Sequence, residues 1–190
     1  MILVDTEIQR AIRRGNIQIT PYNPHNLGSN SYDITLSDIL AVYTEFPLDP
    51  VKDNPVRYYR IPKTGVVLEP GKLYLGSTNE HTYTPHHVPM LEGRSSIGRL
   101  GIDVHATAGV GDIGFKGHWT LEISVKHPVR VYPGLRIGQV LFYKVHGQVT
   151  VPYDEKLSSR YSGQSKLPTP SRYYQHPAGT TKIQINSENE

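Results

Sequence analysis

The sequence predicts a mainly β protein, an antiparallel sandwich or barrel with only short helices. From Ile17 onward the chain consists of short runs of β-branched and aromatic residues, and Gly, Pro and Asn separate these runs. The run 118–125 alternates apolar and polar residues without exception. Both patterns are typical of strands that bury one face and leave the other polar, as in sandwiches and barrels.

One short helix is expected before the first strand. Asp5 or Thr6 can accept a backbone hydrogen bond at its start, and Gly15 can end it after about Arg14. The apolar stripe of this helix comprises Ile8, Ala11 and Ile12. Strands are expected at 31–36, 39–43, 58–61, 66–68, 72–77, 118–125 and 135–145, the last after a Pro-Gly turn.

The composition excludes several classes of protein. The 190 residues suffice for one domain with a real core, expected over 1–172, and a polar tail is expected at 173–190. The formal charge of +3 comes from scattered Lys and Arg, which suits an anionic small molecule better than duplex nucleic acid. Without cysteine there is no disulfide or thiolate metal site. No apolar run suits a membrane span or a signal peptide, so we expect a cytoplasmic protein.

Two polar stretches suggest no chemistry of their own. Residues 47–62 are rich in Asp, Asn and Pro, which is typical of a long surface connection. Residues 81–87 contain three histidines, which would suit a metal site. His86 and His87 are adjacent, however, so on a strand they would face opposite sides, and no carboxylate stands at ligand spacing. We therefore expect solvated loop histidines and no metal ligands here.

The segment 93–101 combines the residue types that hold a phosphate chain. Ser95 and Ser96 lie between Arg94 and Arg99, and glycines stand on both sides. Guanidinium and hydroxyl groups form strong hydrogen bonds to phosphate, and glycines let backbone N–H groups approach the ligand. This pattern indicates a polyphosphate site.

Two carboxylates follow this segment. Asp112 lies in a glycine-rich turn, and Glu122 lies on the polar face of the expected strand 118–125. One of the two could position a sugar and the other could move protons. On the strand pattern alone, an ordinary exposed Glu is the better interpretation. The phosphate-binding pattern and the glycine-flanked Asp just upstream favour a catalytic Glu122.

The chain turns polar after Tyr153. Residues 161–172 are rich in Gly, Ser and Pro and cannot form a regular element, yet they also carry Tyr, Gln, Lys and Arg. Such a segment is either a disordered end or a lid that orders over an anionic ligand. Composition alone favours the disordered end, and the polar residues beyond about 174 supply little that could pack.

Six separated blocks together carry a family resemblance. The blocks are 31–36, 93–101, 104–108, 112–122, 135–139 and 161–172. In this order they resemble the dCTP deaminases of the trimeric dUTPase-like superfamily, over residues 1–172. The resemblance implies a dUTPase-like β-barrel or sandwich, a β-clip, assembled as a homotrimer. Each active site would be shared between neighbouring subunits and closed by a C-terminal lid at about 153–172.

The resemblance also implies roles for individual residues. The triphosphate segment corresponds to Arg94, Ser95, Ser96, Ile97, Gly98 and Arg99. The base-pocket segment corresponds to Thr120, Leu121 and Glu122, and the lid positions to Tyr153, Arg160 and Gln164. Asp112 matches the residue that holds the deoxyribose hydroxyl. The family often has Lys at the position of Arg160. The planar guanidinium group of Arg therefore replaces the compact ammonium group of Lys there.

The implied activity is zinc-independent, hydrolytic deamination of dCTP to dUTP and ammonia, with Mg²⁺ bound through the nucleotide phosphates. Glu122 would act as general base and then as general acid. Ser95 and the backbone near Ala108 would position the water, and Arg99 would stabilise charge. Zinc-dependent deaminases use a His-x-Glu and a Pro-Cys-x-x-Cys pattern, which this cysteine-free chain lacks.

Other functions remain open at this point. The turn 109–117 is similar to the dUTPase motif in which an Asp supports attack of water on the α-phosphate, so a bifunctional enzyme could release dUMP and pyrophosphate. The dUTPase pattern lacks a Glu at position 122 and usually has Ser-Gly at 95–96, which favours deamination. A nucleotide-binding regulator without turnover is the weakest alternative. Inhibition by dTTP and the preferred cytosine nucleotide do not follow from the sequence.

Overall fold

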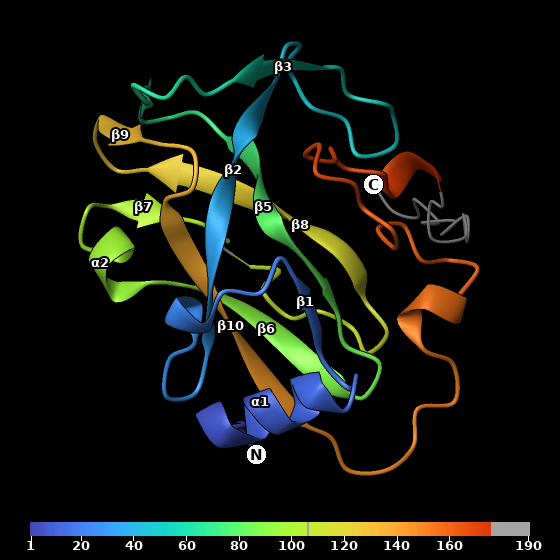
Figure 1. Ribbon diagram of the computed structural model, residues 1–190. Helices are drawn as coiled ribbons and strands as arrows, with labels where there is room; N and C mark the ends of the chain where they lie inside the picture. The colour runs from blue at the N-terminus through green and yellow to red at the C-terminus, as the bar shows by residue number, and fades with distance from the viewer. Residues whose placement is uncertain (106, 176–190) are drawn as a thin grey trace, which may run out of the picture.

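The computed structural model describes residues 1–105 and 107–175, and strands dominate this part of the chain (Figure 1). The strands are β1 (Gln18–Thr20), β2 (Tyr32–Tyr43), β3 (Val56–Arg60), β4 (Val66–Leu68), β5 (Tyr74–Tyr83), β6 (His87–Gly93), β7 (Ile102–Asp103), β8 (Lys116–Val125), β9 (Val129–Val131) and β10 (Arg136–Lys144). The helices are α1 (Asp5–Arg13) and the short α2 (Ser95–Gly98), with 3-10 turns at Pro24–Asn26, Tyr153–Glu155 and Tyr173–Gln175. The predicted class, mainly β with short helices, is confirmed.

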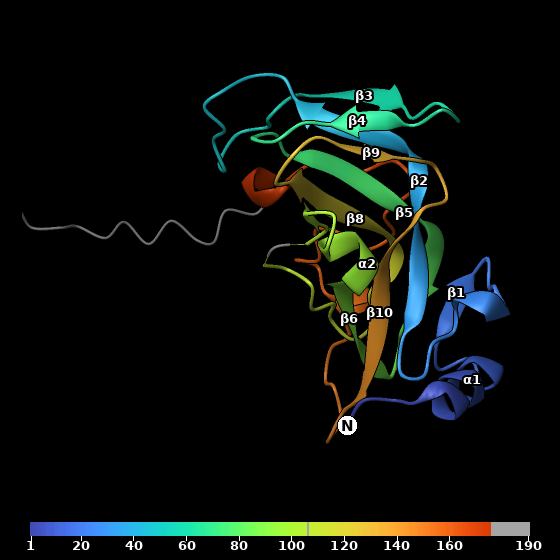
Figure 2. The same ribbon diagram turned by 90° about the vertical axis from the view of Figure 1, so that its left-hand side faces the viewer.

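The strands form a strongly curved antiparallel sheet in which β2 changes partners along its length. The sheet order is β6-β10-β2-β5-β8-β7, with β1 on β5 and β3 on β2, while β4 and β9 form a separate ribbon. Residues 32–35 of β2 pair with β10, and residues 36–41 pair with β5. Because one strand serves both halves, the sheet wraps around its core in a barrel-like form (Figure 2).

The core lies inside this curved sheet. Its fully buried side chains include Tyr32, Leu36, Leu121, Ile123 and Phe142. The strand β8 alternates as the sequence predicts, because its apolar residues are buried while every second residue is only half-buried. Burial of this apolar face provides the main stabilising free energy, and it fixes which face of β8 remains available for chemistry.

The N-terminal helix ends as predicted but begins differently. Ile8 and Ala11 are buried, and Gly15 follows the helix with φ +74°, a conformation that favours glycine. The N-cap residue is Val4, which has no side-chain capping bond. Asp5 accepts a hydrogen bond from the Thr6 backbone N–H instead, at 2.8 Å. The helix is therefore held by its packing more than by a cap.

Pairing between distant segments explains where the predicted boundaries were wrong. The expected strands 31–36 and 39–43 are one continuous β2, and the strand expected at 58–61 is β3, which begins at Val56 within the expected connection 47–62. Of the three expected loop histidines, His86 is exposed, but His81 lies in β5 and His87 begins β6, so the loop assignment is wrong for these two. Among the residues that the structure describes, no group of three potential ligands could hold a metal. No helix in the same ranges is long and apolar enough to cross a membrane.

A buried carboxyl group lies where β2 changes partner from β10 to β5. Glu80 is 3% exposed, and its two oxygens accept hydrogen bonds from the Thr35 backbone N–H and the Thr35 hydroxyl, both at 2.8 Å. Burial raises the pKa of Glu80, and the bonds from Thr35 offset only part of this effect. The carboxyl group thus accepts a hydrogen bond from the Thr35 backbone N–H, which the strand pairing leaves without a partner. Keeping this buried group ionised has an electrostatic cost.

Because ionised Glu80 is unfavourable in the folded state, we expect the free energy of unfolding to depend on pH through this group. A carboxyl with a raised pKa binds its proton more tightly in the folded state, so its contribution to stability is lost as pH rises from the unfolded pKa, about 4.3, through the folded pKa. We expect the free energy of unfolding of Glu80→Gln to rise relative to wild type over this window, measured by urea denaturation at several pH values. The exposed Glu45→Gln is the charge-matched control, and a Glu80→Gln difference that stays constant with pH would contradict the assignment.

Candidate active site

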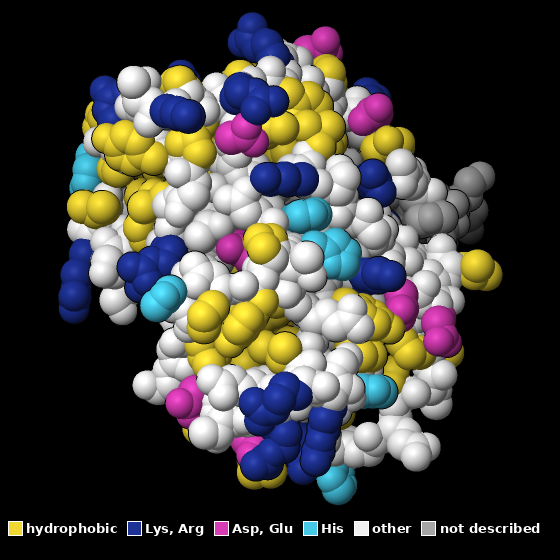
Figure 3. Space-filling model, in the orientation of Figure 1, with side chains coloured by type: hydrophobic (Ala, Val, Ile, Leu, Met, Phe, Trp, Pro, Cys, Tyr) yellow, Lys and Arg dark blue, Asp and Glu magenta, His cyan; other side chains and the backbone are white. Residues whose placement is uncertain are grey.

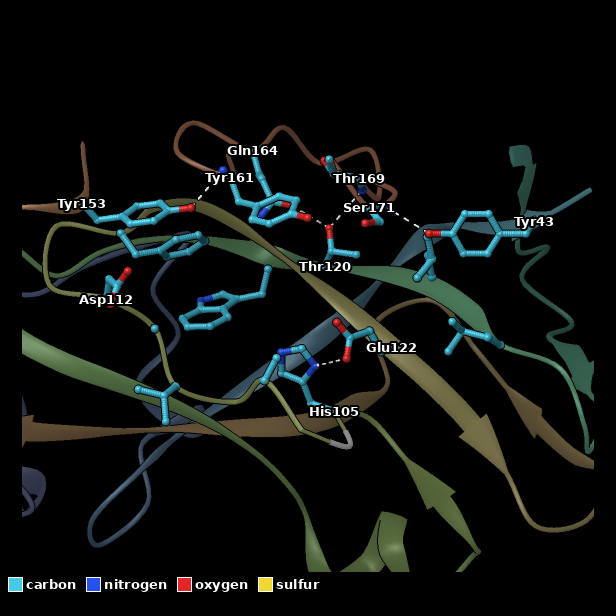
Figure 4. A pocket seen from close by; sticks show the side chains of 17 residues that line it. Tyr43, His105, Asp112, Thr120, Glu122, Tyr153, Tyr161, Gln164, Thr169 and Ser171 are labelled. Atoms are coloured by element: carbon cyan, nitrogen blue, oxygen red, sulfur yellow. Dashed lines mark hydrogen bonds and ion pairs between the residues drawn. The ribbon is translucent and has the colours of Figure 1, made fainter. Parts of the chain in front are cut away.

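A cavity of about 450 Å³ lies beside the polar face of β8 (Figure 4). Five parts of the chain form it: the end of β2, the start of β5, the loop between β7 and β8, β8 itself, and the C-terminal tail, defined here as residues 153–175. Of the residues predicted for the site, it is lined by Ala108, Asp112, Thr120, Glu122, Tyr153 and Gln164. The fold therefore brings together segments that lie far apart in the sequence.

Glu122 and His105 form an ion pair or hydrogen bond at the wall of this cavity. Glu122 Oε2 lies 3.0 Å from His105 Nδ1, and the His105 side chain is 7% exposed. An ionised carboxylate can only accept, so His105 must carry its proton on Nδ1 when Glu122 is ionised. Glu122 Oε1 has no hydrogen-bond partner among the described residues, and the side chain is 38% exposed. This oxygen is free to receive a proton from a ligand or water.

Sequence reasoning missed His105 as a partner of Glu122. It included this residue in the block 104–108 and in the argument against zinc-dependent deaminases, but gave it no role. The contact arises because the chain leaving β7 stays alongside β8, where the Glu122 N–H donates to the Val104 carbonyl oxygen at 3.0 Å. The next side chain, His105, consequently lies against the Glu122 carboxylate. Knowledge of the β7–β8 register would have found it.

Asp112 is held in place by two glycines that close packing requires. A Cβ on Gly111 would lie 2.5 Å from the Trp119 ring and 2.8 Å from Pro89. Gly114 has φ +86°, and a Cβ there would lie 2.5 Å from Asp154. These contacts fix the turn that presents the exposed Asp112, which Figure 4 shows well apart from Glu122.

Aromatic side chains form an apolar part of the wall. The rings of Phe115 and Trp119 lie 4.6 Å apart, and Phe115 and Tyr153 lie 6.3 Å apart. The Trp119 indole N–H donates to the Thr82 hydroxyl at 2.9 Å, which fixes the ring. Such a surface can pack against the planar or apolar part of a ligand and exclude water.

The tail crosses the cavity and is tied to it through Thr120. The Thr120 hydroxyl donates to Gln164 Oε1 at 2.7 Å and accepts from the Thr169 N–H at 3.0 Å. Further along, the Ser171 N–H donates to the Tyr43 hydroxyl at 3.1 Å. Tyr161 of the tail also lines the cavity. Of these residues only Gln164 and Thr120 were predicted, and the region 161–172 forms no regular helix or strand, as expected.

Backbone hydrogen bonds anchor the tail to the edge of β8. The Gly163 N–H donates to the Lys116 carbonyl at 2.7 Å, and the His118 N–H donates to the Gln164 carbonyl at 3.0 Å. Gly117 lies between these bonds, and a Cβ there would be 2.8 Å from the Gln164 nitrogen. Up to residue 175 the tail therefore packs against the cavity, whereas composition alone favoured a disordered end. Most of the expected polar tail, residues 176–190, lies outside the described residues.

The predicted phosphate segment does not line this cavity. Arg94, Ser95, Ser96, Ile97, Gly98 and Arg99 lie at and around α2, which Figure 1 shows on the opposite side of the molecule from the tail. Arg94 Nε is 3.0 Å from Asp33 Oδ1. Leu121 points into the core, and Arg160 lies over the Tyr173 ring at 5.3 Å. The described lining of the cavity contains neither Lys nor Arg.

The chain was compared with protein-family models and with known proteins. The family model described as dCTP deaminase-like matches residues 2–145. A protein of Leptospira biflexa named "dCTP deaminase, dUMP-forming" is 55% identical over 150 residues, which cover 79% of this chain and 86% of that protein. A protein of Clostridium beijerinckii with the same name is 47% identical over 174 residues, covering 92% of this chain and 97% of that protein.

A solved structure supports the fold. The crystal structure of 2'-deoxycytidine 5'-triphosphate deaminase from Agrobacterium tumefaciens matches with a TM-score of 0.61 at 22% identity. The match covers 78% of this chain but only 49% of that one, so this chain spans about half the length of the solved protein. From the family model and the two relatives, the chain belongs to the dCTP deaminase-like family.

Proposed function

We propose that this chain deaminates dCTP hydrolytically and carries the product on to dUMP. The observation that carries the proposal is the pairing of Glu122 with a buried His105 at the wall of a cavity that the tail covers. The names of the relatives include the words "dUMP-forming", which favours the bifunctional alternative over a reaction that ends at dUTP. A regulator without turnover is not favoured, because a protein that only binds a nucleotide does not need a carboxylate held in one orientation by a histidine.

The first step needs one group that handles several protons. Water adds to C4 of the cytosine ring, a proton goes to the ring nitrogen, and another goes to the departing amine, so dCTP and water give dUTP and ammonia. Glu122 Oε1 can take the proton from water and return it, because Oε2 is already occupied by His105. The free oxygen therefore shuttles the proton while the bonded oxygen holds the carboxylate in place.

His105 acts in this scheme as a positioning residue. Its imidazole is nearly enclosed, so it can hold the carboxylate in one rotamer with little freedom to move. The bond to Oε2 persists whether Glu122 is ionised or protonated on Oε1. A fixed carboxylate keeps the attacking water near C4, which is the entropic part of the rate acceleration.

The second step would use the other end of the cavity. Water attacks the α-phosphate of dUTP, and the products are dUMP and pyrophosphate. Asp112 stands apart from Glu122 on its glycine-held turn, and we assign to it the deoxyribose hydroxyl and support of this attack (Figure 4). The separation fits a nucleotide whose base lies at Glu122 and whose sugar lies nearer Asp112.

A neighbouring copy of the chain would supply the phosphate-binding groups. A nucleoside triphosphate carries several negative charges, yet the described lining of the cavity has no cationic Lys or Arg side chain. The segment 94–99 holds two arginines and two serines but lies elsewhere on its own chain. We therefore propose a homotrimer in which this segment of one copy completes the cavity of the next.

Mg²⁺ fits this arrangement as an ion held by the nucleotide. It keeps water ligands and binds phosphate oxygens, so it needs few protein ligands, and the described residues offer no three-ligand cluster for it. When bound, it neutralises phosphate charge. We propose a cytoplasmic setting for the reaction, where deoxynucleotides are made and used.

Replacement of Glu122 by Gln tests the main assignment. Because the amide cannot accept a proton from water, ammonia release from dCTP should fall on the order of a thousandfold, while nucleotide binding persists. Pyrophosphate release from added dUTP should be spared, since that step does not involve C4. Ammonia and pyrophosphate are assayed separately with Mg²⁺ present. Wild-type ammonia release would remove Glu122 from this role, and wild-type protein that gives ammonia without pyrophosphate would leave a deaminase that stops at dUTP.

Replacement of His105 separates positioning from binding. We expect His105→Ala to lower kcat for deamination about tenfold to a hundredfold, with little change in KM, because the carboxylate loses its fixed orientation. His105→Asn places an amide donor near the position of Nδ1 and should restore much of the rate. Steady-state kinetics on dCTP measure both variants. If His105→Asn shows no higher kcat than His105→Ala while both variants remain folded by circular dichroism, the hydrogen bond from His105 to Glu122 does not contribute to the rate.

Mixed oligomers test whether sites are shared. Glu122→Gln and Arg99→Ala should each be inactive alone, but co-expressed chains can combine Glu122 of one copy with Arg99 of another. If copies mix at random, about a quarter of the sites regain both groups, and activity should recover to about a quarter of wild type. The control replaces the second chain by the double variant, which cannot complement. Recovery no greater than in this control would show that each chain forms its own site.

A further inference from the structure

A second cavity, of about 300 Å³, lies where the end of α1 meets the start of β6 and the end of β10. Its charged and titratable lining residues are Glu7, Arg10, Arg14, His86, His87 and Lys144. Figure 3 shows Lys and Arg side chains gathered at this lower end of the molecule, over α1. In Figure 1 this end lies away from the tail that covers the candidate active site.

The positive charge in this cavity is poorly compensated. Glu7 is paired with Arg10, so these two side chains neutralise each other. Arg14 and Lys144 have no carboxylate within 4.0 Å among the described residues, although both line the cavity. The folded chain therefore concentrates two cations and two histidines around one hollow, and an anion would remove the repulsion between them.

The sheet itself brings two of these groups together. His87 and Lys144 are directly opposite each other in the β6–β10 pairing, a position at which like charges destabilise a sheet. Burial lowers the pKa of His87. A hydrogen bond between His87 and the Asn16 backbone raises it, and the neighbouring His86 and Lys144 lower it further. Burial and the neighbouring positive charge thus both disfavour the protonated form of His87.

The ring of His87 also contains a buried nitrogen atom without a hydrogen-bond partner among the described residues. This atom is Nδ1, which is inaccessible to solvent. Buried nitrogen atoms of this kind are nearly always bonded to protein or ligand, so an unsatisfied one marks a position that a ligand can complete. When protonated, both ring nitrogens of His87 become donors.

We propose that this cavity binds a phosphate-bearing anion, with Arg14 and Lys144 as its principal cations and the two histidines as additional donors. The planar guanidinium of Arg14 suits paired phosphate oxygens, and Lys144 adds a point charge. A dianion matches the two unpaired cations, which a single carboxylate would only half compensate. The site is separate from the candidate active site and goes beyond the function proposed above.

The charged groups facing the anion also predict how binding depends on pH. Glu7 and Arg10 on α1 cancel, so Arg14, Lys144 and the two histidines face the anion. Burial lowers the pKa of His87, whereas a bound anion favours its protonated form, so anion binding should be accompanied by proton uptake at His87. The ligand's phosphate could be free, as inorganic phosphate or pyrophosphate, or attached to a nucleotide.

The test follows the imidazole signals of the full chain labelled with ¹⁵N-histidine, and His87→Gln identifies the signal of His87. Inorganic phosphate, pyrophosphate and dUMP are titrated separately at constant ionic strength. We expect saturable shifts at His87, and the ligand with the lowest Kd identifies the source of the phosphate. His105 reports occupation of the candidate active site in the same spectra, so binding there cannot be mistaken for binding here.

Matched variants make the test specific. Arg14→Ala and Lys144→Gln should each raise Kd about fivefold, because each removes a charge-assisted hydrogen bond. Arg13→Ala is the control: Arg13 lies in the same turn of α1 and carries the same charge, but it does not line the cavity. Equal weakening by Arg13→Ala, shifts that never saturate, or a response of His105 alone would overturn the proposal. Since dCTP turnover is assayed separately, failure here leaves the proposed deamination intact.

Discussion

The antiparallel register of β8 between β5 and β7 is the constraint on which the site depends. Glu122 pairs with Leu75 on one side, and its N–H donates to the Val104 carbonyl on the other. Because side chains alternate, a slip of one residue would move Glu122 into the core and expose Leu121. The buried apolar face of β8 makes such a slip expensive, so the packing of the core and the placement of the carboxylate have the same cause.

The same strand also closes the cavity. Its polar face presents Thr120 and Glu122, while its edge near Gly117 accepts the backbone of the tail. The backbone bonds fix where the tail lies, and the Thr120 hydroxyl links it to the ligand space. The side-chain contact of Thr120 with Gln164 and the backbone bonds at residues 163–164 are therefore separate attachments of the tail to β8.

Patterns within a single segment could be predicted, and contacts between segments could not. The alternation of β8, the apolar stripe of α1 and the irregular tail follow from local spacing, and all three are observed. The family resemblance supplied Asp112 and Gln164, but not Tyr43 or His105, because those two reach the cavity through pairings with residues far along the chain. The boundaries of β2 failed and β6 was missed for the same reason, since each strand is defined by its partner strand.

The histidines near the start of β6 show how one observation changes meaning once the fold is known. Adjacent histidines without a carboxylate at ligand spacing argue, on the sequence alone, against a metal. The structure then adds Arg14 and Lys144 from α1 and β10, two elements that the sequence places about 130 residues apart. The one carboxylate that lines the cavity, Glu7, is already paired with Arg10, so none of the described lining residues compensates Arg14 and Lys144. This shortage of negative charge weakens the case for a cation and strengthens the case for an anion, because the ligand that balances the two cations must bring negative charge.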